Sequence, residues 1–272
     1  DAGARFHLVR TVHHVDDFTT QALIDCQRHS IMEPDRVLVV SKLWQRQLND
    51  DYGVQASIIT NGVRCERFAE PLDDERRAEL RRRVGAEDRF LYLTIGGIEP
   101  RKGSNYLIQA LATLKESRRV APVLAVIGGH SFQDYHEYRD NVLSSLPGLG
   151  LELGKDVILL GTVAEHELPE WLAAADGFVF PSVNEGWGLA ILEAACAGLP
   201  VVASDIEVFQ EFLVHDRDAI LTRVAEPDSL ARGMARLIDE PAITRRLGEN
   251  GPSLAARYPW SATAAEHIAI YD

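Results

Sequence analysis

Short apolar runs alternate with helical stretches from Phe90 onward, and this alternation constrains the fold more than any other feature of the chain. Runs such as 90–95 and 123–127 are almost continuously apolar, unlike a strand that has one face in water. Strands of this kind are buried on both faces and pair in parallel through connecting helices. We therefore predict a complete parallel sheet with helices on both sides. The expected strands are 90–95, 123–127, 157–160, 177–180, 201–203 and 219–221, and the expected helices include 104–115, 164–174 and 189–197.

The first sixty or so residues have a shorter version of the same pattern. Apolar runs at 8–12 and 37–40 flank a helical stretch at 17–27, which predicts two parallel strands joined by a helix. A third strand is expected at 57–60. An α/β lobe usually needs about 100 residues or more, and the chain begins in the middle of a pattern with Asp1. We therefore expect this first lobe to be incomplete, as in an N-terminally truncated protein.

The expected organisation is two α/β lobes with a linker between them. Residues 1–62 would form part of the first lobe and residues 90–272 the complete second lobe, while the polar stretch 63–89 would be a linker with one helix at 73–83. Acidic residues begin this helix and arginines end it, so the arginines are interpreted as a solvent-facing surface that matches the helix dipole. The terminal stretch 261–272 is expected to be a helix that returns toward the first lobe.

Composition and charge exclude several classes of function. The 272 residues carry a formal net charge of −13, which argues against nucleic acid and against a polybasic membrane surface. No apolar run approaches the roughly 18 residues of a transmembrane helix, and no signal peptide is visible, so a cytoplasmic location is expected. Cys26, Cys65 and Cys196 are odd in number and widely spaced, which favours three reduced thiols over a disulfide or a metal site.

The stretch "NEGWGLAILEAACAGLPVVASD" at 184–205 contains two acidic residues eight positions apart. Glu185 precedes a glycine turn and a helix, where an acid is favourable simply because it faces the positive end of the helix dipole. Glu193 lies among apolar residues inside that helix, so its carboxylate must be paired or face a cleft. Two acids that frame bare backbone amides would suit a ligand with hydroxyl and phosphate groups. The sequence alone leaves both interpretations, helix capping and a binding site, open.

A second glycine-rich turn, "TIGGIEPRKGS", follows the strand at 90–95. Gly96 and Gly97 permit a ligand to approach the backbone closely, and Arg101 and Lys102 stand at the entrance of the next helix, where phosphate would bind. The order of residues is not that of a P-loop. A basic turn without a ligand is the alternative. "VIGGHS" at 126–131 ends the next strand at the same edge of the sheet.

Two other polar stretches resemble metal-binding motifs. His13 and His14 in "RTVHHVDDF" do not have the spacing of known metal motifs, and successive strand residues point to opposite faces. One histidine is therefore expected to face a cleft and the other to be structural. Asp216 and Asp218 in "DRD" are expected to be solvated turn residues. No metal site is predicted.

Taken together, these stretches resemble the retaining glycosyltransferases of the GT-B fold, in the large glycosyl transferases group 1 often called family 4. The resemblance extends over "TVHH", "DRVLVVSKLWQRQL", "YGVQASIITNGV", "GGIEPRKG" and "GTVAEHEL", and is most specific in "FVFPSVNEGWGLAILEAACAGLPVVASD". It implies two facing Rossmann-like lobes, an acceptor lobe followed by a nucleotide-sugar lobe. It also implies transfer of a sugar from a nucleoside-diphosphate sugar to an acceptor hydroxyl, with retention at the anomeric carbon and with neither a metal nor another cofactor.

The resemblance implies a role for each candidate residue on the donor side. Glu193 would bind the ribose hydroxyls, Glu185 the hydroxyls of the donor sugar, and Lys102 the diphosphate. The family arginine that follows the first glycine is missing, because Gly97 stands there, and Arg101 would supply that charge. His13 would contact the donor sugar near its reacting carbon. The implied catalytic residues are thus His13, Lys102 and Glu185, and the implied donor-binding residues are Gly96, Gly97, Arg101, Lys102, Glu185, Gly188, Leu189, Ala190 and Glu193.

Two other functions remain open from the sequence. A sugar-nucleotide 2-epimerase has the same two-lobed fold but would need more than one carboxylate near the sugar, and only Glu185 is so placed. A non-catalytic module that binds a nucleotide sugar is the second alternative. The sequence does not indicate the sugar, the nucleobase, the acceptor or the oligomeric state.

Overall fold

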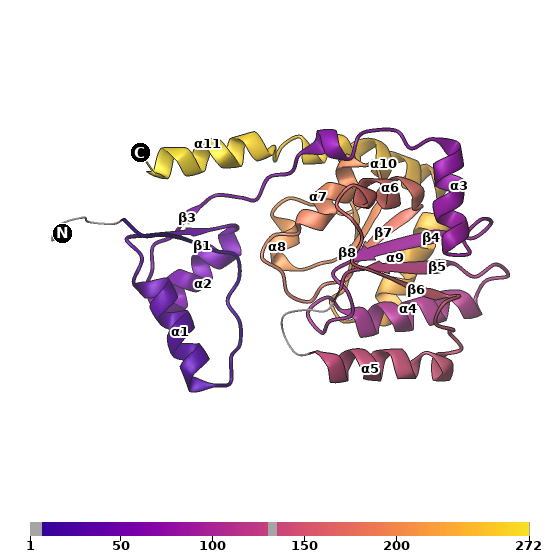
Figure 1. Cartoon of the computed structure of the whole chain (residues 1–272), viewed down its shortest axis with the longest axis horizontal. Coiled ribbons are helices and arrows are strands. Elements are labelled where there is room, and N and C mark those ends of the chain that lie inside the picture. The colour runs from indigo at the N-terminus through magenta and orange to yellow at the C-terminus, as the bar shows by residue number, and fades with distance from the viewer. Residues whose placement is uncertain (1–6, 130–134, 272) are drawn as a thin grey trace.

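The computed structural model describes residues 7–129 and 135–271, which form two parallel β-sheets with helices around them (Figure 1). The first lobe has a three-stranded sheet in the order β1-β2-β3, and the second lobe a six-stranded sheet in the order β6-β5-β4-β7-β8-β9. All strand pairs are parallel. The predicted α/β fold with parallel sheets is therefore confirmed. Of the glycine turn at 126–131, residues 130 and 131 lie outside the described residues.

The six strands of the second lobe form where the apolar runs predict them. Alternate residues of each strand point to opposite faces, because side chains in a strand alternate. Leu91 and Phe178 belong to an apolar cluster that includes residues of α6 and α7, whereas Tyr92 and Val179 belong to one with residues of α4 and α9. None of the described helices is both long and apolar enough to cross a membrane. The strands are β4 (Leu91–Ile95), β5 (Val123–Ile127), β6 (Val157–Gly161), β7 (Gly177–Phe180), β8 (Val201–Ser204) and β9 (Ile220–Thr222), and the helices are α4 (Ser104–Glu116), α5 (His136–Ser145), α6 (Glu167–Ala174), α7 (Leu189–Cys196), α8 (Glu207–Gln210), α9 (Pro227–Asp239) and α10 (Pro241–Ala255), with a 3₁₀ turn η2 (Pro147–Leu149).

The first lobe differs from its prediction in two helices. The helix predicted at 17–27 begins later, because the amide of Asp16 donates to Gln27 Oε1 (2.9 Å) and Gln27 Nε2 donates back to the Asp16 carbonyl (3.0 Å), which holds the preceding segment outside the helix. A second helix was not predicted, although Ser41 caps it by accepting from the amide of Trp44. The elements are β1 (Val9–Val12), α1 (Gln21–Met32), β2 (Arg36–Val39), α2 (Lys42–Tyr52) and β3 (Ser57–Ile58).

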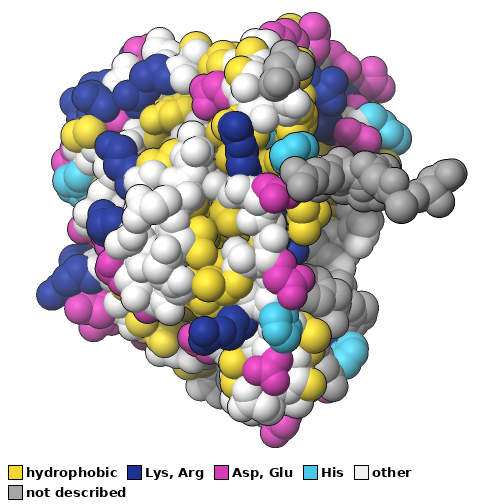
Figure 2. Space-filling view, turned by 90° about the vertical axis from the view of Figure 1, so that its left-hand side faces the viewer, with side chains coloured by type: hydrophobic (Ala, Val, Ile, Leu, Met, Phe, Trp, Pro, Cys, Tyr) yellow, Lys and Arg dark blue, Asp and Glu magenta, His cyan; other side chains and the backbone are white. Residues whose placement is uncertain are grey.

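Helix α1 is mostly exposed on the outer face of the first lobe. Ile31 is its only buried residue, whereas Leu23, Ile24 and Met32 are 47%, 39% and 46% exposed. Figure 2 shows apolar side chains on this face, with Lys and Arg side chains in separate places among them. No continuous basic surface is present on the face shown.

The segment between β3 and β4, called the linker below, contains the 3₁₀ turn η1 (Cys65–Arg67) and helix α3 (Asp74–Arg83). The arginines of α3 do not all face solvent as predicted. Arg81 donates to Asp176 Oδ2 and to the Ala174 carbonyl (both 2.9 Å), and Arg76 Nη2 donates to Glu170 (2.7 Å). These contacts fasten α3 to α6 and to the loop that follows α6, which a sequence pattern cannot show because the partners are more than 90 residues away.

The last helix, α11 (Trp260–Tyr271), leaves the second lobe beside the linker and extends over the first lobe (Figure 1). Val63 and Pro259 form a parallel bridge, and Thr263 Oγ1 donates to the Thr60 carbonyl (2.9 Å). Gly62 permits this approach, since a Cβ there would lie 2.6 Å from the Cα of Trp260. Two chain segments therefore connect the lobes side by side.

The cysteine prediction is wrong for two of the three residues. Cys65 in η1 and Cys196 at the end of α7 form a disulfide, with their Cα atoms 5.0 Å apart and a separation of 131 positions in sequence. Count and spacing did not indicate the pair, because only the fold brings the linker against α7. Cys26, on α1, is an exposed free thiol as predicted.

Candidate functional site

Two loops meet at the carboxyl edge of the large sheet, one after β4 and one after β7, which are neighbouring strands. The amide of Val183 donates to the Arg101 carbonyl (2.9 Å) and so joins the loops. Gly103 has φ of +66°, and a Cβ there would overlap the carbonyl of Pro181. Only glycine therefore suits this position, and its close approach sets the distance between the two predicted glycine turns.

This approach brings Glu185, Arg101 and Lys102 together, which we call the cation cluster. Lys102 Nζ lies 2.6 Å from Glu185 Oε1, and Arg101 Nη1 lies 3.0 Å from Glu185 Oε2. Glu185 is only 8% exposed, and Lys102 Nζ also lies 4.6 Å from the centre of the Phe180 ring. The charged hydrogen bond from Lys102 to Glu185 is strong in such a setting, and together with the Arg101 ion pair it holds these side chains in place. Two cationic groups are thus held beside the turn that precedes α7.

Gly96 and Gly97, in the loop after β4, leave room for the Lys102 side chain and for the backbone of the loop after β5. A Cβ at Gly96 would lie 2.6 Å from Lys102 Cε, so the lysine side chain lies across this residue. Gly97 has φ of +72°, and a Cβ there would be 3.0 Å from the carbonyl oxygen of Gly129. A side chain at position 97 would therefore be strained in this backbone conformation.

Helix α7 begins at Leu189, with Gly188 as its N-cap at φ of +116°. The first amides of a helix have no partner within the helix, and they carry a partial positive charge. The amides of Gly188, Leu189 and Ala190 follow the turn of Glu185 directly along the chain. The first amides of α7 thus follow Glu185, which holds both cations, within five residues of the chain, and positive groups of both kinds suit a phosphate.

Glu193 lies one turn further along α7 and lines a separate cleft of about 330 Å³. Burial raises the pKa of Glu193 to about 7, and the nearby Arg67 partly opposes this shift. Among the described residues the Glu193 carboxylate has no hydrogen bond or ion pair, and Arg67 instead pairs with Glu165 (2.9 Å). The sequence did not indicate its neighbours, which come from the linker and from α11. The cleft, called the Glu193 cleft below, is lined by Gly62, Val63, Arg64, Arg67, Phe68, Leu189, Glu193 and Trp260.

His13 follows β1 and packs against the same turn from the first lobe. A Cβ at Gly186 would overlap the His13 carbonyl oxygen, so the two backbones touch. Trp44 Nε1 donates to the Glu185 carbonyl (3.2 Å), a second contact between the lobes that the sequence did not indicate. The pKa of His13 is lowered, first by burial and then by the neighbouring His14, His267 and Arg10, which favours the neutral imidazole.

The expectation that only one of the paired histidines faces a cleft is wrong. His13 and His14 both line a cleft of about 460 Å³ between β1 and α1. The strand ends at Val12, so the alternation of strand side chains does not apply to them. His14 Nε2 lies 3.4 Å from Asp16 Oδ2. Within residues 7–129 and 135–271, no group of three or more His, Cys, Asp or Glu side chains could hold a metal ion.

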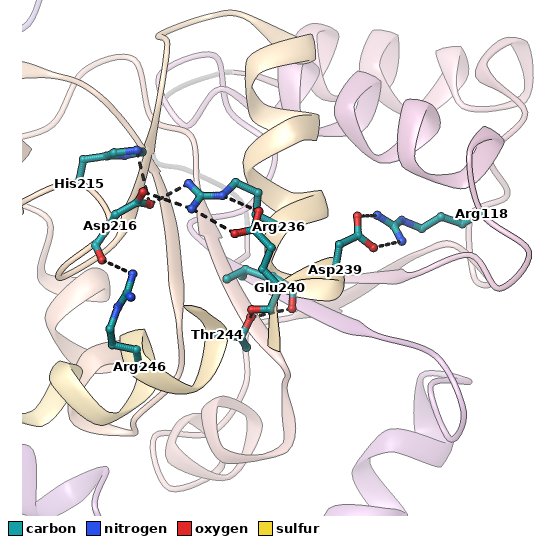
Figure 3. A network of polar contacts seen from close by, with 9 residues as sticks. Arg118, His215, Asp216, Arg236, Asp239, Glu240, Thr244 and Arg246 are labelled. Atoms are coloured by element: carbon teal, nitrogen blue, oxygen red, sulfur yellow. Dashed lines mark hydrogen bonds and ion pairs between the residues drawn. The ribbon is translucent and has the colours of Figure 1, made fainter. Parts of the chain in front are cut away.

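The "DRD" stretch is structural and less solvated than predicted. Asp216 Oδ1 accepts from Arg236 Nη1 (2.7 Å; Figure 3), and this bond lowers the pKa of Asp216. Asp218 is 7% exposed and accepts from the amide of Val214 (2.9 Å). Both carboxylates therefore hold the turn before β9 in place.

Comparisons with known proteins show what the chain is similar to. The family model described as Glycosyl transferases group 1 matches residues 76–254. The chain is 34% identical over 224 residues to D-inositol 3-phosphate glycosyltransferase 2 of Catenulispora acidiphila, covering 80% of this chain and 50% of that protein. It is 28% identical over 249 residues to an uncharacterized glycosyltransferase of Methanocaldococcus jannaschii, covering 89% and 61%. The chain thus spans about half to three fifths of the length of these relatives.

The solved structures that are similar share the two-lobed architecture. The structure of Anabaena HepE in complex with UDP and glucose has a TM-score of 0.85 and 22% identity, covering 97% of this chain and 71% of that one. Sucrose-phosphate synthase from Thermosynechococcus elongatus has a TM-score of 0.81 and 22% identity, covering 98% and 68%. At this identity the similarity concerns the fold, and it confirms the GT-B architecture.

Proposed function

Because the chain belongs to the glycosyl transferases group 1 family, we propose that it binds a nucleoside-diphosphate sugar and transfers the sugar to an acceptor hydroxyl, with retention of configuration as in family 4. The observation that carries this proposal is the cation cluster at the start of α7. Lys102 and Arg101 are held by Glu185 beside the free amides of a helix N-terminus. This arrangement suits a diphosphate that becomes a leaving group.

The donor would lie along α7. The diphosphate would accept hydrogen bonds from the amides of 188–190 and from Lys102 and Arg101. The Glu193 carboxylate would accept from the ribose hydroxyls, and Glu185 from hydroxyls of the sugar. His13, which belongs to the first lobe, would contact the sugar near its reacting carbon.

Transfer would break the bond between the anomeric carbon and the phosphate oxygen and form the bond to the acceptor oxygen on the same face of the sugar. The proton of the acceptor hydroxyl would pass to the departing phosphate. Negative charge grows on the diphosphate as it leaves, and positive groups already in position stabilise it without reorganisation. We propose that Lys102, Arg101 and the α7 amides supply enough positive charge for this step without a metal ion.

The first test is binding of nucleotides to the chain. UDP, GDP and ADP, each alone and with glucose attached, would be titrated by calorimetry. At least one is expected to bind, and Lys102→Met should weaken its binding at least tenfold, because a charge-assisted bond of roughly 1.5–3 kcal/mol is lost. Lys155→Met is the matched control, since the Lys155 side chain is 63% exposed and, in the part of the chain that the structure describes, pairs only with the exposed Glu152. If no nucleotide binds, or if the two variants lose the same amount of affinity for the nucleotide, the proposed site is wrong.

The second test is the product. The donor that binds would be incubated with D-inositol 3-phosphate, glycerol or water, and the anomeric configuration of the product would be read by NMR. A glycoside with the configuration of the donor supports a retaining transferase. A new nucleotide sugar would indicate an epimerase, and bound donor without product would indicate a binding module.

A further inference from the structure

The Cys65–Cys196 disulfide joins the two walls of the Glu193 cleft. Cys65 opens η1, two residues before Arg67, and Cys196 ends α7, three residues after Glu193. Arg67 and Glu193 both line the cleft, one from the linker and one from the helix. The bond therefore ties the linker segment that lines the cleft to the helix that carries Glu193.

Other contacts hold the linker to other parts of the molecule. Arg67 is bonded to Glu165, and the amide of Val63 donates to the Tyr258 carbonyl (2.9 Å). Among the described residues, no hydrogen bond or ion pair connects η1 to α7. Apart from side-chain packing, the position of η1 against this helix thus depends on the disulfide.

We propose that the Cys65–Cys196 pair is a redox latch that sets the affinity of the Glu193 cleft for the nucleoside part of the donor. The proposal rests on the proposed function, since it assumes that Glu193 binds ribose. In the oxidised form the linker is fastened to α7 and the cleft is preformed. In the reduced form η1 is free to move, so binding must also order it, and affinity falls.

The reaction that opens the latch is exchange with a dithiol. A thiolate of the dithiol attacks Cys65 Sγ, because Cys65 is half-buried whereas Cys196 is only 4% exposed. The sulfur–sulfur bond breaks, Cys196 leaves as a thiolate and takes up a proton. The second thiolate of the dithiol then attacks the mixed disulfide and releases Cys65. Two electrons pass from the dithiol to the protein, the dithiol becomes a disulfide, and two protein thiols form.

The first measurement establishes the bond. Thiol titration of the folded, unreduced chain should find one free thiol, Cys26, of the three cysteines. After treatment with dithiothreitol the count should be three. Three free thiols before reduction would overturn the proposal.

The second measurement compares affinities in the two states. The nucleoside diphosphate that binds the oxidised chain most tightly among UDP, GDP and ADP is expected to bind the reduced chain on the order of tenfold more weakly, a common size for coupling between two parts of a protein. Inorganic pyrophosphate, which does not reach Glu193, should bind both forms equally. Cys26→Ser should behave as the parent chain, and Cys65→Ser and Cys196→Ser should bind weakly with or without reductant. Circular dichroism of each form at the same temperature would establish that it is folded.

The outcomes separate this inference from the proposed function. If none of the three nucleoside diphosphates binds the oxidised chain, the proposed function fails first. Equal affinity of a folded oxidised and a folded reduced chain would overturn the latch and leave the proposed function intact. A lower melting temperature on reduction with unchanged affinity would show that the bond only stabilises the fold, and would also overturn the latch.

Discussion

At the scale of single residues, the two acids of the α7 region have different environments that predict different behaviour. Glu185 holds Lys102 and Arg101, whereas the Glu193 carboxylate has no hydrogen bond or ion pair among the described residues and lines a cleft. Glu193→Ala should therefore weaken the nucleoside diphosphate and its sugar alike, by roughly 1.5–3 kcal/mol for a lost charged hydrogen bond. Glu185→Gln should weaken only the nucleotide sugar, because it frees both cations for the diphosphate. Calorimetry with both ligands measures these changes. If both variants lose the same affinity for both ligands, the two acids do not have the separate roles proposed here.

The raised pKa of Glu193 predicts a pH dependence of binding. The carboxylate accepts two hydroxyls only when ionised, and its pKa is about 7. Affinity for the nucleoside diphosphate should therefore fall as pH falls, roughly tenfold between pH 8 and pH 6 if the ionised form alone binds. Glu193→Gln removes this part of the dependence and leaves only the titration of the phosphate itself. The same raised pKa means that the empty protein loses stability as pH rises from about 4.5 to 7, because the folded state then holds more protons than the unfolded one.

Sequence reasoning identified the residues of the cation cluster but not the neighbours of Glu193. Glu185 and Lys102 stand in glycine turns after apolar strands, and the rule that parallel strands end at one edge brings them together. Arg67 and Trp260 come from the linker and from the start of α11, which no local pattern places near α7. The disulfide was missed for the same reason.

At the scale of elements, strands were predictable because burial on both faces leaves an unbroken apolar run. The ends of helices were less predictable than the strands. Helix α1 begins later than expected because Gln27 holds the segment before it by two hydrogen bonds. The arginines of α3 show a further limit, since charge alone does not distinguish a solvated side chain from one bonded to a neighbouring element. Arg81 is only 15% exposed and bonds to Asp176, whose carboxylate also accepts from the amide of Leu91.

The contact between Arg81 and Asp176 predicts that two arginines of α3 respond differently to substitution. Arg81→Met should lower the free energy of unfolding by roughly 2–4 kcal/mol, because Asp176 loses its cationic partner and the carbonyls of Ala86, Ala174 and Arg89 each lose a donor. Arg82→Met, one residue along the same helix and exposed, should change it by less than about 0.5 kcal/mol. Urea unfolding of the two variants measures the difference. Similar values for both would mean that α3 does not dock on the second lobe in this way.

At the scale of the whole molecule, the two lobes share one apolar cluster. Val39 and Trp44 of the first lobe belong to the same cluster as Phe209 and Phe212 of the second. We therefore expect a single cooperative unfolding transition, with coincident curves from tryptophan fluorescence and from circular dichroism. Two separate transitions would contradict this, because they would mean that the lobes unfold independently.

The contact between α2 and the second lobe allows the most direct test of how the lobes are joined. Glu211 accepts from the amides of Lys42 (2.9 Å) and Leu43 (3.0 Å), so a residue of the second lobe caps a helix of the first. The charge also faces the positive end of the α2 dipole, which strengthens the contact. Glu207 bridges the same two regions through an exposed ion pair with Arg46.

Replacing each acid by alanine should therefore have unequal effects. Glu211→Ala leaves two helix amides without a partner and should lower the free energy of unfolding by roughly 1–3 kcal/mol, and it should speed hydrogen exchange at Lys42 and Leu43. Glu207→Ala removes a surface ion pair and should cost less than about 1 kcal/mol. Glu211→Gln keeps an acceptor for the amides, so its loss in the free energy of unfolding should lie between those of the two alanine variants. If Glu211→Ala leaves exchange at these amides unchanged, the lobes are not joined through this cap, and the placement of His13 beside the turn of Glu185 loses its support.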